Sequence, residues 1–174
     1  MNKKYPPTPP LGELRLATIS DVPRIAVVAT SSFFYSPLSA WERRYHAQYP
    51  EDTLKDYART FADFIRNPET IVLVAEDSYQ PNEHSKRGAV ITSHLDDKIY
   101  QEGGTVVVGI AAWHLPTGSE RAGQFVNPED LNNKVFEGGL SRDKDLEHGK
   151  AIWNVVVKEE ARYDGPSPQS TSDD

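Results

Sequence analysis

The sequence of 174 residues contains no cysteine. This absence excludes disulfide bonds, metal sites built from thiolates and a cysteine nucleophile. No apolar run approaches the roughly 20 residues that a membrane-spanning helix needs. Prolines also occupy the N-terminal position where a signal peptide has its apolar core. From these absences we expect a soluble intracellular protein, in the cytosol or the nucleus, with no membrane partner.

The chain also has few basic residues for its size. It carries 19 Lys and Arg against 26 Asp and Glu, which gives a net charge of -7 and an isoelectric point of about 5.2. Such a balance disfavours a protein that coats nucleic acid or anionic lipid. We therefore expect no nucleic-acid partner. The length suits one ordinary domain, and two would be cramped.

Sequence motifs for common catalytic sites are missing as well. The stretches GGTVVVG, RAGQF and EGGL match neither a Walker loop nor a dinucleotide fingerprint. There is no Gly-x-Ser-x-Gly elbow, and no two of the five histidines stand at metal-ligand spacing, so we expect no metal site. His114 ends a predicted strand, where a histidine is usually a surface or hydrogen-bonded residue.

Hydrophobic periodicity predicts a succession of short elements. They are a strand at 14–19, a helix within 20–34, one or two helical turns within 36–50, a helix at 51–66, strands at 70–77 and 105–114, and a helix at 146–163. We expect a disordered arm at 1–12 and a disordered tail at 164–174. The domain between them spans 13–163 and carries a polar insertion at about 78–104, with room for a short strand at 89–93.

The helices have apolar stripes at helical spacing. Ser20 or Asp21 is expected to cap the first helix, and Asn67-Pro68 to end the second. The strand at 70–77 is apolar without alternation, which predicts that both of its faces are covered. The stripe residues are Val22, Ile25, Ala26 and Ala29; Leu54, Tyr57, Ala58, Phe61, Phe64 and Ile65; and Leu146, Trp153, Val156, Val157 and Tyr163.

Aromatic residues gather in the segment FFYSPLSAWERRYHAQY, residues 33–49. Aromatic rings with polar tips on a loop suit a binding wall. For Phe33 and Trp41 we instead expect a place in the core beneath the loop. The binding role therefore falls first to Tyr35, Arg44 and Tyr45, whereas a nucleic-acid surface is disfavoured by the negative net charge.

Several stretches together resemble GNAT-superfamily N-acetyltransferases. LRLATISDVPRIAVVATSSFF resembles the opening strand and helix of that family, TIVLVAED its second strand and TVVVGIAAWHL its third. SERAGQF and RDKDLEHGKAIW resemble a fungal branch. The resemblance spans about 14–163 and implies an α/β (α+β) fold, in which a mixed, mostly antiparallel sheet is flanked by helices.

The resemblance implies transfer of an acetyl group from acetyl-CoA to a small-molecule or peptide amine. The family holds the cofactor with an Arg/Gln-x-x-Gly-x-Gly/Ala loop after a fourth strand, and this sequence contains neither. We therefore expect an incomplete GNAT-like fold, truncated and inactive by itself, with no cofactor-binding residue and no assigned catalytic residue. The family's acceptor wall maps onto Tyr35, Trp41, Arg44 and Tyr45.

Two alternatives remain open. The first is a non-enzymatic pseudo-acetyltransferase module that associates with itself or a partner through an open edge strand at 105–114. The second is an unrelated small α/β enzyme. It would be favoured if Leu14–Ile19, Thr70–Asp77 and Thr105–His114 were not neighbouring strands.

Overall fold

The computed structural model describes residues 14–81, 100–132 and 136–163. The expected helices and strands all lie within one or a few residues of their predicted positions, while the expected arm, tail and short strand at 89–93 lie outside the described residues. The elements are β1 (Leu14–Leu16), η1 (Ile19–Asp21), α1 (Val22–Phe33), α2 (Pro37–Glu42), α3 (Pro50–Arg66), β2 (Thr70–Ser78), β3 (Thr105–His114), η3 (Pro128–Asn132) and α4 (Leu146–Tyr163).

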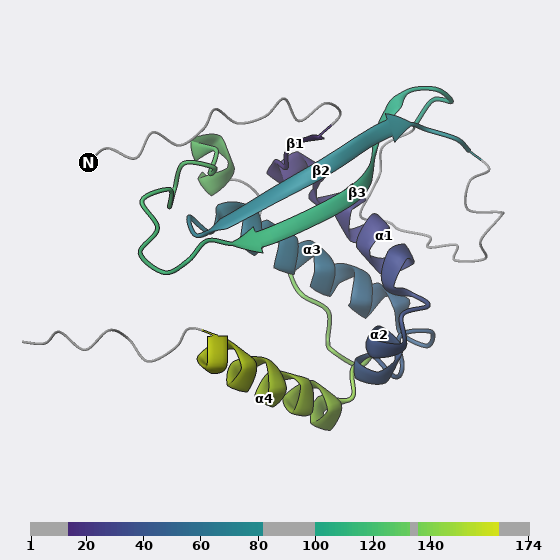
Figure 1. Cartoon of the computed structure of the whole chain (residues 1–174). Coiled ribbons are helices and arrows are strands. Elements are labelled where there is room, and N and C mark those ends of the chain that lie inside the picture. Colours follow the sequence, from purple (N-terminus) through teal and green to yellow (C-terminus); the bar gives the residue numbers. More distant parts are fainter. Residues whose placement is uncertain (1–13, 82–99, 133–135, 164–174) are drawn as a thin grey trace, which may run out of the picture.

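The three strands form one sheet in the order β1-β2-β3, and both pairings are antiparallel (Figure 1). The three predicted segments are therefore neighbours, which removes the ground for an unrelated α/β enzyme. The described strands include no parallel pair, so the mixed sheet that we expected is not seen in this part of the chain. β3 lies at one edge of the described sheet.

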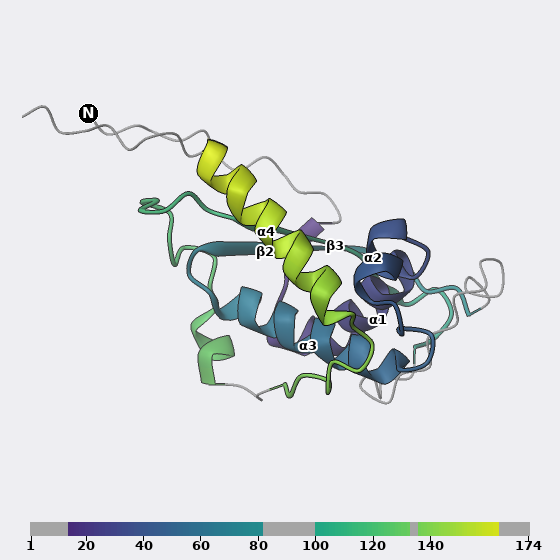
Figure 2. The same cartoon turned by 90° about the horizontal axis from the view of Figure 1, so that it is seen from below.

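Helices α1 and α3 cover one face of this sheet, as the view from below makes plain (Figure 2). Their predicted stripes face the core: Ile25 on α1 and Ala58 on α3 are almost completely buried. Val72 and Val74 of β2 meet them from the sheet. Pro50 begins α3, and Asn67-Pro68 ends it as predicted. These contacts make α1, α3 and the sheet one packed unit.

The start of α1 differs from the prediction. Asp21 precedes the helix, but its side chain makes no cap hydrogen bond to it. Instead Asp21 accepts hydrogen bonds from the backbone N–H of Thr18 at 2.8 Å and from both terminal nitrogens of Arg15. Burial opposes ionisation of Asp21, and the hydrogen bonds from Arg15 and Thr18 outweigh it, so its pKa is lowered. Arg15 of β1 also donates to Glu76 of β2, so the carboxylate of Asp21 binds the arginine that joins these two strands and does not cap α1.

The second face of the sheet is apolar and has no helix packed on it among the described residues. Leu14 and Leu16 of β1 are 41% and 39% exposed, and Trp113 of β3 is 53% exposed. Ile71 and Leu73 on the same face of β2 are half-buried. The expectation that the strand at 70–77 is covered on both faces is therefore wrong for this part of the chain.

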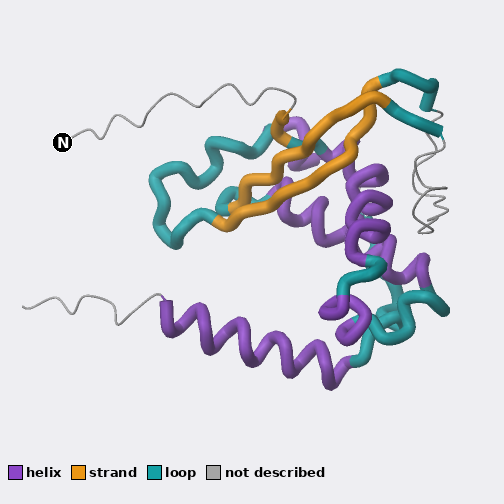
Figure 3. The backbone as a smooth tube through the Cα atoms, turned by 45° about the vertical axis from the view of Figure 1, so that its right-hand side comes forward, coloured by secondary structure: helices purple, strands orange, loops and turns teal. Residues whose placement is uncertain are grey.

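Helix α4 runs apart from the body, as the backbone tube shows (Figure 3). Its predicted span is confirmed, but its apolar residues are exposed, with Leu146 and Trp153 each at 65%. Its N-terminal end lies near α2, and its other end reaches away from that helix. In the described ranges, no helix is both long and apolar enough to cross a membrane.

Candidate functional site

A small pocket lies where α1, α2 and α3 meet. It is shallow and open to solvent, and its cavity volume is about 10 Å³, which is room for one water-sized group. Its walls carry aromatic rings, hydroxyl groups, one imidazole and one guanidinium: Thr30, Phe33, Phe34, Ser39, Arg43, His46, Pro50, Thr53 and Tyr57.

The aromatic wall has a defined geometry. The rings of Phe33 and Tyr57 stack with centroids 6.0 Å apart, so that the end of α1 rests on α3. Phe34 meets the imidazole of His46 edge to face at 5.0 Å. Burial raises the pKa of Tyr57, and the nearby Arg43 partly opposes this rise. The phenol is therefore neutral throughout the physiological range.

Arg43 anchors the floor of the pocket. Its guanidinium donates hydrogen bonds to Asp143 and, at 2.8 Å, to Asp56 of α3, and all three side chains are buried. Its charge also lies over the ring of Tyr57, 4.8 Å from the centroid. Thr53 donates a further hydrogen bond to Asp143 at 2.8 Å. The loop before α4 is thereby fixed to α2 and α3.

This buried cluster holds opposite charges in close contact. Burial disfavours ionised Asp56, but hydrogen bonds from Lys144 and Arg43 outweigh it and lower its pKa. Asp143 Oδ2 accepts from both Arg43 and Thr53, whereas its Oδ1 is buried with no hydrogen-bond partner among the described residues. A buried ion pair is costly to break, because removing one partner leaves the other charge uncompensated. The cluster therefore holds Arg43 in one position.

A second ion pair binds the same loop to the start of α3. Asp52 accepts two hydrogen bonds from the guanidinium of Arg142, at 2.8 and 2.9 Å, and a third from the backbone N–H of Arg142. The hydrogen bonds from Arg142 hold the pKa of Asp52 at about 2. Next to this pair, Gly139 passes so close to the α3 backbone that a Cβ atom there would lie 2.6 Å from the Cα of Asp52.

The structure places the predicted acceptor residues outside the pocket, in two places. Tyr35 is exposed and lies edge-on against Phe34. The other three lie where α2 meets the start of α4. Trp41 stacks on His148 with centroids 4.1 Å apart, Arg44 reaches to 4.0 Å from Asp145, and Tyr45 donates its backbone N–H to the carbonyl of Asp143 at 2.9 Å.

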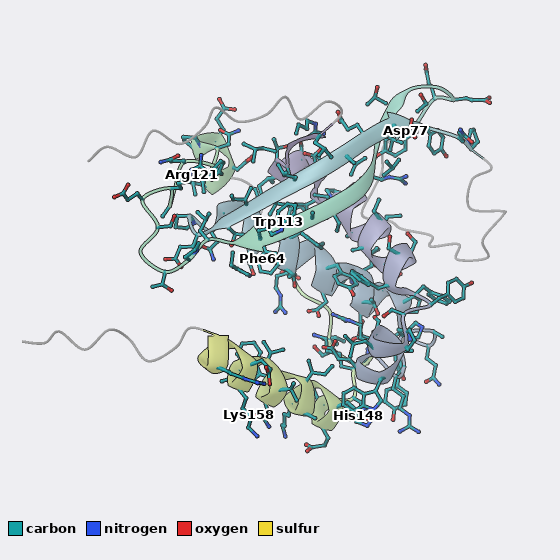
Figure 4. All side chains as sticks on the ribbon, in the orientation of Figure 1. Phe64, Asp77, Trp113, Arg121, His148 and Lys158 are labelled. Atoms are coloured by element: carbon teal, nitrogen blue, oxygen red, sulfur yellow. The ribbon has the colours of Figure 1, made fainter. Side chains whose placement is uncertain are left out.

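Figure 4 shows His148 at the end of α4 nearest α2, and Lys158 farther along the helix. Trp41, with its predicted core role, is 41% exposed, and Phe33 is 46% exposed. His114, as expected for a hydrogen-bonded histidine, shares a 3.3 Å hydrogen bond with Thr70.

Sequence reasoning missed the residues that build the pocket. It favoured exposed Arg44 over its neighbour Arg43, which is buried, and it gave His46 no role. The available signal was the acidic pair Asp52 and Asp56, spaced one helical turn apart beside the apolar stripe of α3. Carboxylates so close to a buried face require cationic partners. In the part of the chain that the structure describes, no three His, Asp or Glu side chains are grouped to hold a metal ion.

The chain is 35% identical over 164 residues to a protein named "Acetyltransferase" from Stachybotrys chartarum (strain CBS 109288 / IBT 7711). The matched region covers 92% of this chain and 60% of that protein, so the chain spans less than two thirds of the relative's length. No family model matches the sequence. No solved structure matches the chain.

Proposed function

We propose that the chain is the acceptor-binding part of an acetyl-CoA-dependent N-acetyltransferase of the GNAT type. The observation that carries this proposal is the similarity to a protein named "Acetyltransferase" over nearly the whole chain. Three neighbouring antiparallel strands with two helices on one face agree with the first half of the fold that the sequence resemblance implies.

The described residues do not fit the phosphates of acetyl-CoA. A helix N-terminus binds phosphate through free backbone N–H groups, and a nearby carboxylate opposes that binding. Asp21 precedes α1, Glu51 and Asp52 lie in the first turn of α3, and Glu147 lies in the first turn of α4. Prolines also remove N–H groups from the first turns of α1 and α3. We therefore assign acetyl-CoA binding to none of these residues, and we expect this chain alone to be inactive.

The four residues predicted to contact the acceptor keep that role in the proposal. Trp41, Arg44 and Tyr45 lie together at the junction of α2 and α4, and Tyr35 lies at the end of α1. As exposed side chains, they would contact an acceptor bound at the surface. Substituting them in an active longer relative should weaken acceptor affinity, and unchanged affinity would remove this assignment.

Two measurements test the proposed function. The Stachybotrys protein, incubated with acetyl-CoA and a panel of primary amines, should release free CoA thiol only when an amine is present. This chain, unfolded thermally with and without saturating acetyl-CoA, should show no shift. A bound ligand at about 100 times its dissociation constant would add roughly 2.7 kcal/mol, a shift of several degrees. Lack of amine-dependent thiol release by the relative would contradict the acetyltransferase proposal, and a clear thermal shift would contradict the cofactor assignment.

A second candidate is association through β3. The observation that favours it is that this strand of ten residues lies at the edge of the described sheet. Edge strands offer unpaired N–H and C=O groups to another chain. A stable dimer at micromolar concentration in sedimentation would support this non-enzymatic role, whereas a monomer would argue against it.

A further inference from the structure

We propose that two copies of this chain form a symmetric dimer, in which the apolar stripe of α4 of each copy covers the open sheet face of the other. The α4 stripe consists of the exposed residues Leu146, Trp153, Val156 and Val157. The open sheet face is the one turned away from α1 and α3, and its residues are Leu14, Leu16, Ile71, Leu73, Ala75, Gly109, Ala111 and Trp113. This inference goes beyond the proposed function, and it uses different surfaces from association through the edge of β3.

The strand pairings place these sheet residues on one face. Leu16 lies opposite Leu73, Leu73 lies opposite Ala111, and Ile71 lies opposite Trp113. Residues directly opposite each other in neighbouring strands point to the same side of a sheet. None of the residues of the open sheet face is charged, so an apolar helix can pack on it without burying a charge. An apolar sheet face of this kind is normally covered by another element.

The apolar residues of α4 lie together along one side of the helix. Val157 is four positions after Trp153, and Leu146 is seven positions before it, which are spacings of one and two helical turns. Helix α2 meets a different side of α4, where the ring of His148 stacks on Trp41 with centroids 4.1 Å apart. The contact with α2 therefore leaves the α4 stripe exposed.

Helix α4 is held away from the sheet of its own chain. The backbone N–H of Asp145 donates to the carbonyl of Glu42 at 2.8 Å, and Nδ1 of His148 donates to the carbonyl of Trp41 at 2.8 Å. These bonds fix the start of α4 on α2, while Figures 1 and 3 show the rest of the helix apart from the strands. Packing α4 on its own sheet would break these bonds, whereas a second copy can meet the stripe with the bonds intact.

The two surfaces match in length. Helix α4 has 18 residues and is about 27 Å long, and β2 and β3, of nine and ten residues, are each about 30 Å long. A helix about 10 Å wide covers roughly 300 Å² of its partner along that length. Because each copy provides one helix and receives one, the dimer buries about 1,200 Å² in total, the lower end of the range for stable interfaces. A two-fold axis closes this arrangement at two chains.

The test is sedimentation velocity of the chain over a range of concentrations. An interface of this size predicts a weak dimer, so we expect a dimer at about 100 µM and a monomer at about 1 µM. In dilute samples Trp153 therefore stays in solvent.

Two valines of α4 provide a matched pair of variants. Val157 belongs to the α4 stripe, whereas Val155, two positions before it, points to another side of the helix. Both are exposed in the single chain, at 43% and 61%, so neither change to glutamate should disturb folding. Val157→Glu should raise the dissociation constant of the dimer about tenfold or more, because each dimer would bury the new charge twice. Val155→Glu should change that constant by less than about twofold.

A substitution on the sheet tests the other half of the contact. Leu16→Glu should weaken the dimer as Val157→Glu does, because it places a charge on the open sheet face. An equimolar mixture of these two variants should contain more dimer than either variant alone. The reason is that a mixed pair joins one unchanged α4 stripe to one unchanged sheet face.

Three results would overturn the proposal. A monomer at every concentration would mean that no second copy covers these surfaces, which would leave them to the additional sequence that the longer Stachybotrys protein has. A dimer weakened by Val157→Glu but not by Leu16→Glu would mean that two α4 helices pair with each other. A dimer that neither substitution weakens would indicate pairing through the edge of β3.

Discussion

Helices α3 and α4 are of nearly equal length, 17 and 18 residues, and both carry apolar residues at helical spacing. The stripe of α3 is buried against α1 and β2, with Phe61 only 8% exposed, whereas Trp153 of α4 is 65% exposed. An apolar stripe predicts a helix, but the stripe does not show which surface of the protein will cover that helix. Burial depends on contacts between distant parts of the chain.

The two helices also differ in how polar residues fix them. Asp52 and Asp56 of α3 form ion pairs with the loop at 142–144. Among the described residues, α4 is held mainly near its start, where His148 stacks on Trp41 of α2. The pocket therefore lies in the well-packed part of the molecule, beside α3.

The largest expected effect separates the two apolar stripes. Phe61→Ala should lower the free energy of unfolding by about 3 to 5 kcal/mol, because it opens a cavity in the core. Trp153→Ala should change it by less than about 0.5 kcal/mol, because the indole is mostly in solvent. Chemical denaturation of both variants measures the difference. Similar losses would mean that α4 is packed in solution.

The next comparison concerns two adjacent arginines. Arg43→Met should cost about 3 to 5 kcal/mol, since it leaves the buried carboxylate of Asp143 without its cation, while Asp56 keeps Lys144 and Arg59. Arg44→Met should cost less than about 0.5 kcal/mol, because the side chain of Arg44 is 63% exposed. Both changes in the free energy of unfolding can be calculated from the denaturation midpoints, provided that the variants show the same dependence on denaturant concentration. A neutral Arg43→Met would remove the claim that this cluster fixes the pocket.

Substitutions of two glycines are expected to change the stability of the protein in opposite directions. Gly139→Ala should destabilise the protein by about 1 to 3 kcal/mol, because the new methyl group would meet the backbone of Asp52. Gly149→Ala, in α4, meets nothing within 4 Å and should stabilise that helix by about 0.5 to 1 kcal/mol. Thermal unfolding monitored by circular dichroism measures both changes in stability. If both substitutions raised the stability, or both lowered it, the close packing at Gly139 or the open space at Gly149 would be contradicted.

The smallest expected effect is a dependence of stability on pH. The pKa of Asp52 is lowered in the folded protein to about 2, below its ordinary value near 3.9 in an unfolded chain. Its contribution to stability should therefore be complete above about pH 4 and decline as the pH falls toward 2. In a denaturation series, Asp52→Asn should be less stable than the unchanged chain at neutral pH, and the gap should narrow in acid. Glu147→Gln, in an exposed pair on α4, serves as the control. A gap that stays constant with pH would exclude the Arg142 pairing as its cause.

Much of the local structure could be predicted because it depends on nearby residues. Asn67-Pro68 ended α3 as predicted, and the apolar runs at 70–77 and 105–114 became paired strands. These signals lie within a few residues of their effects. Asp21 does not cap α1, because its carboxylate binds Arg15 of β1 instead.

The pocket could not be predicted, because it depends on contacts between residues far apart in the sequence. Arg43 meets Asp143 across 100 positions of sequence, and nothing local distinguishes Arg43 from Arg44. Similarly, the apolar pattern of β2 could not show that α1 and α3 would cover only one of its faces.

The central claim is a division of labour, in which these residues bind the amine and not acetyl-CoA. One NMR sample of the labelled chain, given first acetyl-CoA and then n-propylamine, tests it directly. The expected result is an unchanged spectrum after the first addition, and saturable shifts at Tyr35, Trp41, Arg44 and Tyr45 after the second. Saturable shifts with acetyl-CoA, or no saturable shift at these four residues with the amine, would contradict the claim.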